Sequence, residues 1–429
     1  MSWIRGNASD YLDLSDVLVA AATGNSLQTV DSISAAGSGY VVGEIITFTG
    51  GTFSVATQLE VTSVGGSGDV TGVRIYNAGI YTVNPSDSNA TTASASGTGA
   101  TFTHTYAANG WAVDRNTTWS GSEKEVIMHG SGGGSDAIYV GWRTLSGSGY
   151  YNFELHGFTG YDSGLDHDEQ PGASPGFHDA TLDTGKHGCY LLCLNSTVSY
   201  WININSYRII LVIKVGSAYF NAYLGFGNRF GTVSEYPYPL CIAGHTSQPL
   251  DPYTQTKLSS GLVDPWADNS YNGNGPMVVM NTDNQWYQVK NGDVSISSRT
   301  ARRDVCVTPA QTPAGTNDNS IPPEDKFCNG GSGAAPFSDI INQTSLGGSP
   351  TINTETVPGT TNAHILLPAT IVMFTPSIQI LMELDEVYWC SGFNIVTEDR
   401  IIIGSTVYRV FQNCNRTDTY AYLAVREAS

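Results

Sequence analysis

The chain has 429 residues, of which 40% are hydrophobic and 10% aromatic, and this composition is typical of a folded protein with several cores. Charged residues make up only 13%, and 38 acids against 19 lysines and arginines give a net charge of -19. Such an acidic surface repels phosphate, which argues against direct nucleic-acid binding and against an anionic membrane surface.

The low charge also bears on contacts between subunits. Glycine (48) and tyrosine (23) are abundant, and threonine, serine and asparagine are frequent. Burying a hydroxyl or an amide costs less than burying a charge, so a polar, mostly uncharged surface suits extensive subunit contact. The length favours two or three domains over one.

The N-terminus does not read as a secretory signal peptide, because no basic region precedes an apolar one. The most apolar stretches, residues 209–215 and 365–374, have the length of strands and are interrupted by Lys214 and Pro368. We therefore expect no membrane insertion and folding in a cytosol.

The first predicted element is a helix over residues 10–23, within an N-terminal helical segment, 1–24. Asp10 is suited to cap its start and Gly24 to end it. Its apolar residues recur at helical spacing and share one face: Leu14, Val17, Leu18 and Ala21.

Residues 25–108 have a different character, because Thr, Val, Ser and Gly alternate and glycine turns recur about every ten residues. Tyr40 and Tyr81 take matching places in a weak internal echo. We expect a small β-sandwich or β-roll of short antiparallel strands. Its position between the helix and the core predicts a projecting module.

Residues 109–250 predict a central β domain. Residues 150–158 alternate apolar and polar side chains, which is typical of a half-buried strand. Residues 208–215 are almost continuously apolar, so we expect this strand to be buried on both faces.

The remaining chain divides into two parts. Residues 251–365 are loop-rich, with short apolar segments such as 276–280 and 286–289. A stretch of this length is too long for an ordinary connection, so we expect it to pack along neighbouring parts of the assembly. Residues 366–429 predict a final β unit with a hairpin at Gly404. Together the elements predict a mainly β fold: multidomain antiparallel β-sandwiches with one short N-terminal helix and long loops.

The seven cysteines fit no zinc-binding pattern. Cys189 and Cys193 lie on one predicted strand about 13 Å apart, too far for a disulfide, so we interpret them as buried apolar side chains. Cys306 and Cys328 flank a loop rich in Pro, Asn and Asp. A particle that leaves the cell can oxidise such thiols, so a disulfide within or between subunits stays open for this pair.

No motif in the chain indicates catalysis, a cofactor or a metal site; P-loop, GxSxG, HExxH and kinase patterns are absent. One acidic cluster has the residue types of a calcium site: Asp162, Asp166, His167, Asp168 and Glu169. Its spacing lacks ordered calcium ligands, so we interpret it as a solvated loop. A weaker metal alternative combines nearby histidines and aspartates: His178, Asp179, Asp183 and His187.

A glycan-directed role stays open as a minor alternative. Paired carboxylates for glycoside cleavage are a spatial feature that sequence does not reveal, but the rungs of a β-helix depolymerase are absent. The eight tryptophans and 23 tyrosines are commoner in core and interface packing than in sugar platforms.

Three segments resemble structural proteins of tailed-bacteriophage virions. Residues 37–102 resemble glycine–tyrosine inserts shared among such proteins. Residues 199–240 are similar to the central signature of neck and tail sheath proteins, also called collar sheath proteins, and residues 392–425 resemble their tail. The opening residues are similar to that family's start, which implies no further N-terminal domain, whereas 251–365 has no match.

The resemblance implies a structural subunit on the exterior of the virion neck or tail, assembled in the host cytoplasm, with no catalytic residue. It implies a homo-oligomeric ring of about six or twelve copies that contacts other neck and tail proteins, with fibres as a further partner. Three rival roles stay open. They are a tail-tip, baseplate or host-receptor-binding adhesin, a capsid decoration protein, and a depolymerase.

Overall fold

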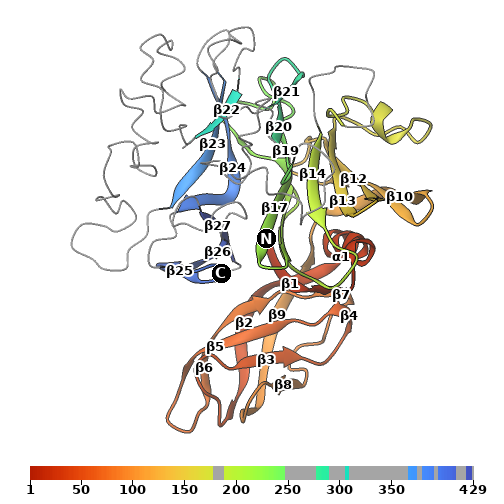
Figure 1. Cartoon of the computed structure of the whole chain (residues 1–429). Helices are drawn as coiled ribbons and strands as arrows, with labels where there is room; N and C mark the ends of the chain where they lie inside the picture. Colours follow the sequence, from red (N-terminus) through yellow and green to blue (C-terminus); the bar gives the residue numbers. More distant parts are fainter. Residues whose placement is uncertain are drawn as a thin grey trace, which may run out of the picture.

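The computed structural model describes residues 1–176, 188–246, 277–288, 305–308, 366–373, 379–390, 395–411 and 422–427. This described part is mainly β, with several antiparallel sheets and a single α-helix (Figure 1). The predicted fold class is confirmed.

The central sheet has seven strands in the order β1-β15-β16-β17-β19-β20-β21. Its strands are β1 (Ser2–Ala8), β15 (Val198–Ile204), β16 (Arg208–Val215), β17 (Ala218–Phe226), β19 (Leu240–Ala243), β20 (Met277–Met280) and β21 (Trp286–Gln288). Strand β16 is buried along nearly all its length, as its apolar run predicted.

Three members of the central sheet differ from the sequence-based expectation. Strand β1 pairs antiparallel with β15, Ser2 lying opposite Ile204, although sequence reasoning saw only the helix in this segment. Strands β20 and β21 lie in the short apolar segments of the loop-rich region, and they extend the sheet at its other edge. Strand β1 finds its partner about 200 residues along the chain, and β20 and β21 have only four and three residues, so none of the three stands out locally in the sequence.

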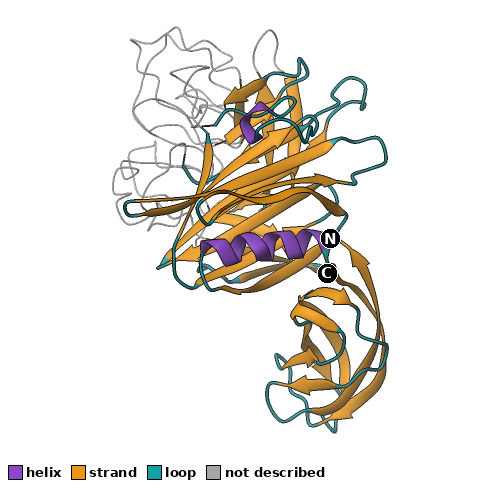
Figure 2. Cartoon of the chain, turned by 90° about the vertical axis from the view of Figure 1, so that its right-hand side faces the viewer, coloured by secondary structure: helices purple, strands orange, loops and turns teal. Residues whose placement is uncertain are grey.

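The helix α1 (Tyr11–Thr23) follows the prediction closely. The Asp10 side chain accepts hydrogen bonds from the backbone N–H groups of Leu12 and Asp13, both at 2.9 Å. The predicted apolar face packs inward, with Leu14 and Ala21 fully buried. Figure 2 shows α1 lying along the body beside the strands and close to both chain termini.

The helix ends at Gly24 for a reason other than a left-handed conformation. Gly24 has an extended backbone, with φ of -77°. A Cβ atom there would lie 2.7 Å from the Ala20 carbonyl oxygen, so the chain can leave the helix this closely only with glycine.

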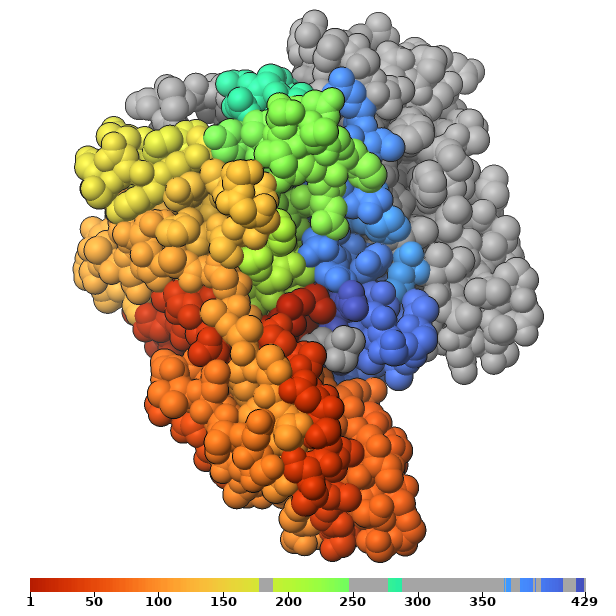
Figure 3. Space-filling view, turned by 180° about the vertical axis from the view of Figure 1, so that it is seen from behind, coloured from red at the N-terminus to blue at the C-terminus, as the bar shows by residue number. Residues whose placement is uncertain are grey.

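The N-terminal module, defined as residues 25–108, contains two four-stranded sheets, β4-β7-β2-β9 and β6-β5-β3-β8. Its strands are β2 (Asn25–Ser38), β3 (Ile45–Phe48), β4 (Thr52–Val55), β5 (Gln58–Val64), β6 (Val70–Asn77), β7 (Ile80–Val83), β8 (Thr91–Ala93) and β9 (Thr98–Ala108). Contrary to the expectation of short strands, β2 and β9 form one long pair whose register shifts three times. The module lies at one end of the molecule (Figures 1 and 3).

The two tyrosines of the internal echo are both buried but are not equivalent. Tyr40 lies in the connection between β2 and β3, and its hydroxyl accepts from the Ala100 N–H at 3.1 Å. Tyr81 lies on β7 and its hydroxyl accepts from the Thr57 N–H at 2.9 Å. The echo therefore reflects similar local composition and does not mark a repeated structural unit.

A second sheet of five strands, β10-β11-β12-β13-β14, packs in the body of the molecule. Its strands are β10 (Trp111–Ser120), β11 (Glu123–Gly130), β12 (Ile138–Gly147), β13 (Tyr150–Phe158) and β14 (Cys189–Cys193). The half-buried prediction for β13 is wrong, because Asn152, Glu154 and His156 are as buried as their apolar neighbours. The loop 159–176 covers this polar face, with His167 packed against His156 at 4.8 Å between ring centroids.

The C-terminal sheet has the order β22-β23-β24-β27-β26-β25, and β18 (Asn228–Arg229) also pairs with β24. Its other strands are β22 (Val305–Thr308), β23 (Leu367–Met373), β24 (Gln379–Cys390), β25 (Arg400–Ile403), β26 (Thr406–Phe411) and β27 (Tyr422–Arg426). Gly404, with φ of 63°, turns the predicted hairpin between β25 and β26.

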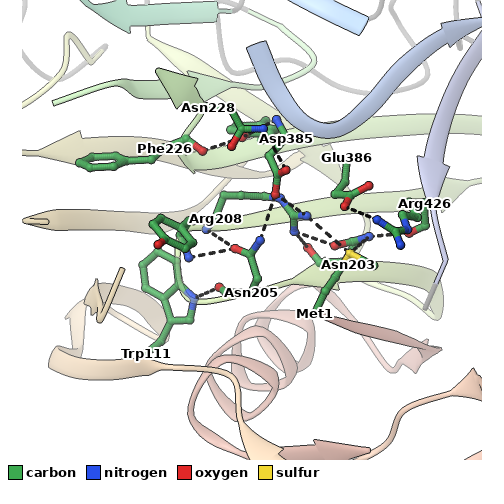
Figure 4. Close-up of polar contacts among 12 residues, drawn as sticks. Met1, Trp111, Asn203, Asn205, Arg208, Phe226, Asn228, Asp385, Glu386 and Arg426 are labelled. Atoms are coloured by element: carbon green, nitrogen blue, oxygen red, sulfur yellow. Dashed lines mark hydrogen bonds and ion pairs between the residues drawn. The ribbon is translucent and has the colours of Figure 1, made fainter. Parts of the chain in front are cut away.

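A buried polar network joins the central sheet to the C-terminal sheet (Figure 4). Arg208 on β16 is fully buried, and its guanidinium lies 3.0 Å from the carboxylate of Asp385 on β24. It also donates to the side-chain oxygen of Asn203 at 2.6 Å. Asp385 accepts further hydrogen bonds from Asn205 and Asn228. The carboxylate is thus shared between two sheets.

Breaking the Arg208–Asp385 pair should cost more stability than a surface ion pair. Asp385→Ala leaves a buried guanidinium without its carboxylate, and we expect the free energy of unfolding to fall by about 3 kcal/mol. Urea denaturation of the full chain measures this change.

The matched control is Asp16→Ala, which removes the more exposed partner of Lys124 and should cost under about 1 kcal/mol. Adding Arg208→Met to Asp385→Ala should recover part of the loss, because it removes the uncompensated charge. Equal losses for Asp385→Ala and Asp16→Ala would contradict this account of the network.

Candidate functional site

A cleft of about 670 Å³ lies where the N-terminal module, the central sheet and the segment before β25 meet. Its lining includes Arg5 and Asn7 from β1, Gln58 and Tyr76 from the module, Trp201 from β15, and Glu398. This volume is within the range of small-molecule sites in proteins. The cleft is therefore large enough for one ligand of modest size.

Arg5 is the charged residue of the cleft that stacks on aromatic rings and has no carboxylate beside it. It is half-buried, and its guanidinium carbon lies 4.6 Å from the ring centroid of Tyr76 and 6.0 Å from that of Trp201. Asn77 fixes its backbone by donating to the Arg5 carbonyl at 2.8 Å. Stacking on two aromatic rings holds the charge in place without neutralising it.

Within the described part of the chain, Arg5 is the one arginine that makes no ion pair. All the other described arginines contact carboxylates at 3.0 Å or less: Arg74, Arg115, Arg143, Arg208, Arg229, Arg400, Arg409 and Arg426. A chain with twice as many acids as bases thus leaves this guanidinium without a carboxylate.

The second cation of the cleft is already neutralised. The Lys214 ammonium lies 3.3 Å from the Glu398 carboxylate, and the Tyr219 hydroxyl donates to the same oxygen at 2.5 Å. The hydrogen bond to Tyr219, together with Glu398, raises the pKa of Lys214. Burial raises the pKa of Tyr219, and its hydrogen bond to Glu398 adds to the effect. The three groups form a compact set without net charge.

Ion pairs connect the two walls of the cleft, which are the N-terminal module and the segment that leads into β25. Glu60 of the module binds Arg74 at 2.6 Å and Arg400 of β25 at 2.5 Å. Burial alone raises the pKa of Glu60, but hydrogen bonds from the two arginines outweigh it and hold that pKa below its usual value. Arg400 also lies 5.5 Å from the ring of Tyr76, so this ring sits between two guanidinium groups.

The acidic cluster noted in the sequence occupies a different place, on the polar face of β13. The interpretation as a solvated loop is wrong for its centre, because His167 is fully buried in a short 3-10 turn, His167–Glu169. Asp168 pairs with Arg143 at 2.7 Å, and Asp162 and Asp166 are exposed. Among the residues that the structure describes, no three potential ligands gather around a metal position.

Burial of His167 has an electrostatic consequence. Burial, followed by the nearby His156, Arg143 and Arg115, lowers the pKa of His167 well below its ordinary value. The Glu125 carboxylate lies 3.9 Å away from its ring nitrogen. The alternative metal group, His178, Asp179, Asp183 and His187, lies outside the described residues.

Of the cysteines singled out in the sequence, three lie in the described residues and one does not. Cys189 and Cys193 are buried free thiols on β14, as predicted, and burial raises the pKa of Cys193 to about 12. Cys306 lies on β22 opposite Val372, whereas Cys328 lies outside the described residues. The disulfide between these two stays a prediction.

Comparison with known proteins adds no relative: no protein-family model matches the chain, and no curated protein matches its sequence. In the described residues, no helix has the length and apolarity needed to span a membrane.

Sequence reasoning predicted no residue of the cleft. The lining comes from strands near residues 5, 76 and 201 and from a turn near 398, so no local motif marks it. The one sequence feature that could have indicated the cleft is Arg5, the single charged residue in the N-terminal strand. Whether that arginine lines a binding site depends on the rings that stack against it, which the sequence does not show.

Buried neutral histidines predict a loss of stability in acid. The folded protein resists protonation of His167, while the unfolded chain binds that proton below about pH 6.5. Stability from this histidine is therefore complete above about pH 6.5 and falls as the pH is lowered. Between pH 7.5 and pH 5, we expect His167→Phe to lose about 2 kcal/mol less stability than the unmodified chain.

Urea denaturation at the two pH values measures the difference. His245→Phe is an independent test at a site just after β19, because burial lowers the pKa of His245 to about 3 and the new ring can stack on Phe220 as His245 does. Identical acid losses in the unmodified chain and both variants would show that these histidines do not govern the pH dependence.

Proposed function

We propose that the chain is a structural subunit of a tailed-phage particle that assembles with copies of itself into a collar or sheath around the neck or tail. The resemblance of residues 37–102, 199–240 and 392–425 supports this class of protein. The second of these segments forms β15, β16 and β17 in the middle of the central sheet and ends at the start of β19. On this proposal the chain has no catalytic task.

The observation that supports self-assembly best is the edge of the C-terminal sheet. Strand β25 is the last strand on its side in the described sheet. Its residues Ile402 and Ile403 are 58% and 48% exposed, and Val396 just before it is 64% exposed. Soluble proteins normally protect such edges with charges, proline or bulges, because an open apolar edge pairs with other strands.

A second copy of the chain is the occupant that suits this edge. A head-to-tail contact that closes by rotation produces a ring, and in a ring the same contact surface is covered on every subunit. The surface is mostly polar without being charged, so large interfaces form at low desolvation cost. The N-terminal module lies at one end of the molecule in Figure 3, and its Glu60 contacts Arg400 of β25, so the part of the module near β25 lies beside such a contact.

Disrupting the edge should dissociate the assembly. Light scattering after size exclusion should find the unmodified chain as a closed oligomer of about six or twelve copies. Ile402→Lys combined with Ile403→Lys should yield folded monomers, because two ammonium groups at the contact cannot be desolvated cheaply.

The matched control places two lysines at Val41 and Val42, which are 55% and 62% exposed on a turn of the module. This control should assemble like the unmodified chain. A chain that is monomeric at every concentration, or a module variant that dissociates while the edge variant does not, would refute assembly through β25.

Cryo-electron microscopy of the intact virion tests where in the particle this subunit lies. Density for this fold around the connector or tail tube is the expected result. Density confined to the tail tip would favour the adhesin role, and density on the head would favour capsid decoration.

A further inference from the structure

We propose that the cleft beside Arg5 is a binding site for a carboxylated sugar unit of the uronic-acid or sialic-acid type. This activity is separate from assembly through the β25 edge. It rests on the charge, ring and hydrogen-bonding geometry of the cleft.

The first step concerns the sign of the ligand's charge. A guanidinium carries five N–H donors, and at a half-buried position the donors that meet no acceptor of the protein are available to a ligand. Arg5 makes no side-chain hydrogen bond or ion pair with any described residue, although the chain contains 38 acidic residues. An anionic ligand would satisfy these donors and gain charge-assisted hydrogen bonds.

The second step concerns how many charges the ligand carries. Lys214 forms an ion pair with Glu398 at 3.3 Å, so Arg5 is the single uncompensated charge in the lining. One planar guanidinium matches one planar carboxylate in a bidentate arrangement. A phosphate-rich ligand such as a nucleotide or nucleic acid would need several free cations, whereas Arg5 is the one uncompensated cation of this lining.

The third step identifies the rest of the ligand as a sugar. Tyr76 lies between the guanidinium groups of Arg5 and Arg400, and Trp201 is only 3% exposed, so these two rings position Arg5 and leave the ligand to the polar groups of the lining. The other polar groups of the lining are neutral amides and hydroxyls, such as Asn7, Gln58 and Thr47, which suit sugar hydroxyl groups.

The fourth step is preorganisation. The Glu60–Arg400 contact at 2.5 Å ties the module to β25, and Tyr76 is held between Arg5 and Arg400. The walls of the cleft are therefore fixed before a ligand arrives, which reduces the entropy lost on binding.

The test is a calorimetric and ligand-observed NMR titration of the full chain. The probes are glucuronic acid and N-acetylneuraminic acid, with glucose and acetate as controls for the ring and for the charge. We expect at least one sugar acid to bind with a Kd below about 5 mM, and both controls to bind at least about tenfold more weakly. Absence of binding by both sugar acids, or equal binding of acetate, would overturn the proposal.

Variants connect the binding to the named residues. Arg5→Met keeps an unbranched side chain against the rings but removes the charge, and should weaken sugar-acid binding at least about tenfold. Tyr76→Ala should weaken it by a similar factor, because the Arg5 guanidinium loses the ring that positions it. Lys124→Met, which removes an equal charge on β11, should leave the affinity unchanged.

Two further measurements keep the result interpretable. Circular dichroism and thermal melting establish that each variant is folded. The lysine variant at Ile402 and Ile403 should still bind the sugar acid, and Arg5→Met should still assemble, so failure of either proposal is visible without the other. A folded Arg5→Met chain that binds as tightly as the unmodified chain would refute the site.

Discussion

The contact between Arg208 and Asp385 is the interaction on which the arrangement of this molecule depends most directly. A fully buried guanidinium is tolerable only when its charge and donors are met, so the C-terminal sheet must lie where Asp385 reaches β16. The same logic recurs at Arg400 with Glu60 and at Arg143 with Asp168. In a chain with few cations, these arginines form ion pairs that connect one sheet to another or a sheet to a loop.

Local patterns in the sequence predicted the elements whose causes are local. The helix at residues 10–23 was predictable because its cap and its apolar face lie within a few turns. The burial of β16 was predictable because both its faces are apolar in sequence. The turn at Gly404 followed from a glycine between two apolar strands.

What escaped prediction depends on contacts between distant segments. The polar face of β13 looked solvent-exposed, and only the loop 159–176 buries it. Strand β1 joins the central sheet through β15, almost 200 residues away in sequence. The cleft is the strongest case, because the meaning of Arg5 depends on Tyr76 and Trp201, and sequence alone does not show that they meet.

The segment that ends in β25 belongs to both proposed surfaces. Glu398 lines the cleft and Arg400 holds Glu60, while Val396, Ile402 and Ile403 form the exposed edge. Ion pairs hold this segment within the single subunit, Glu398 with Lys214 and Arg400 with Glu60 and Glu427, so a neighbour that covers the edge leaves the wall of the cleft unchanged. Two binding events are coupled only when one of them changes the free energy of the other. Assembly and ligand binding are therefore expected to be independent of each other, although both use this short segment.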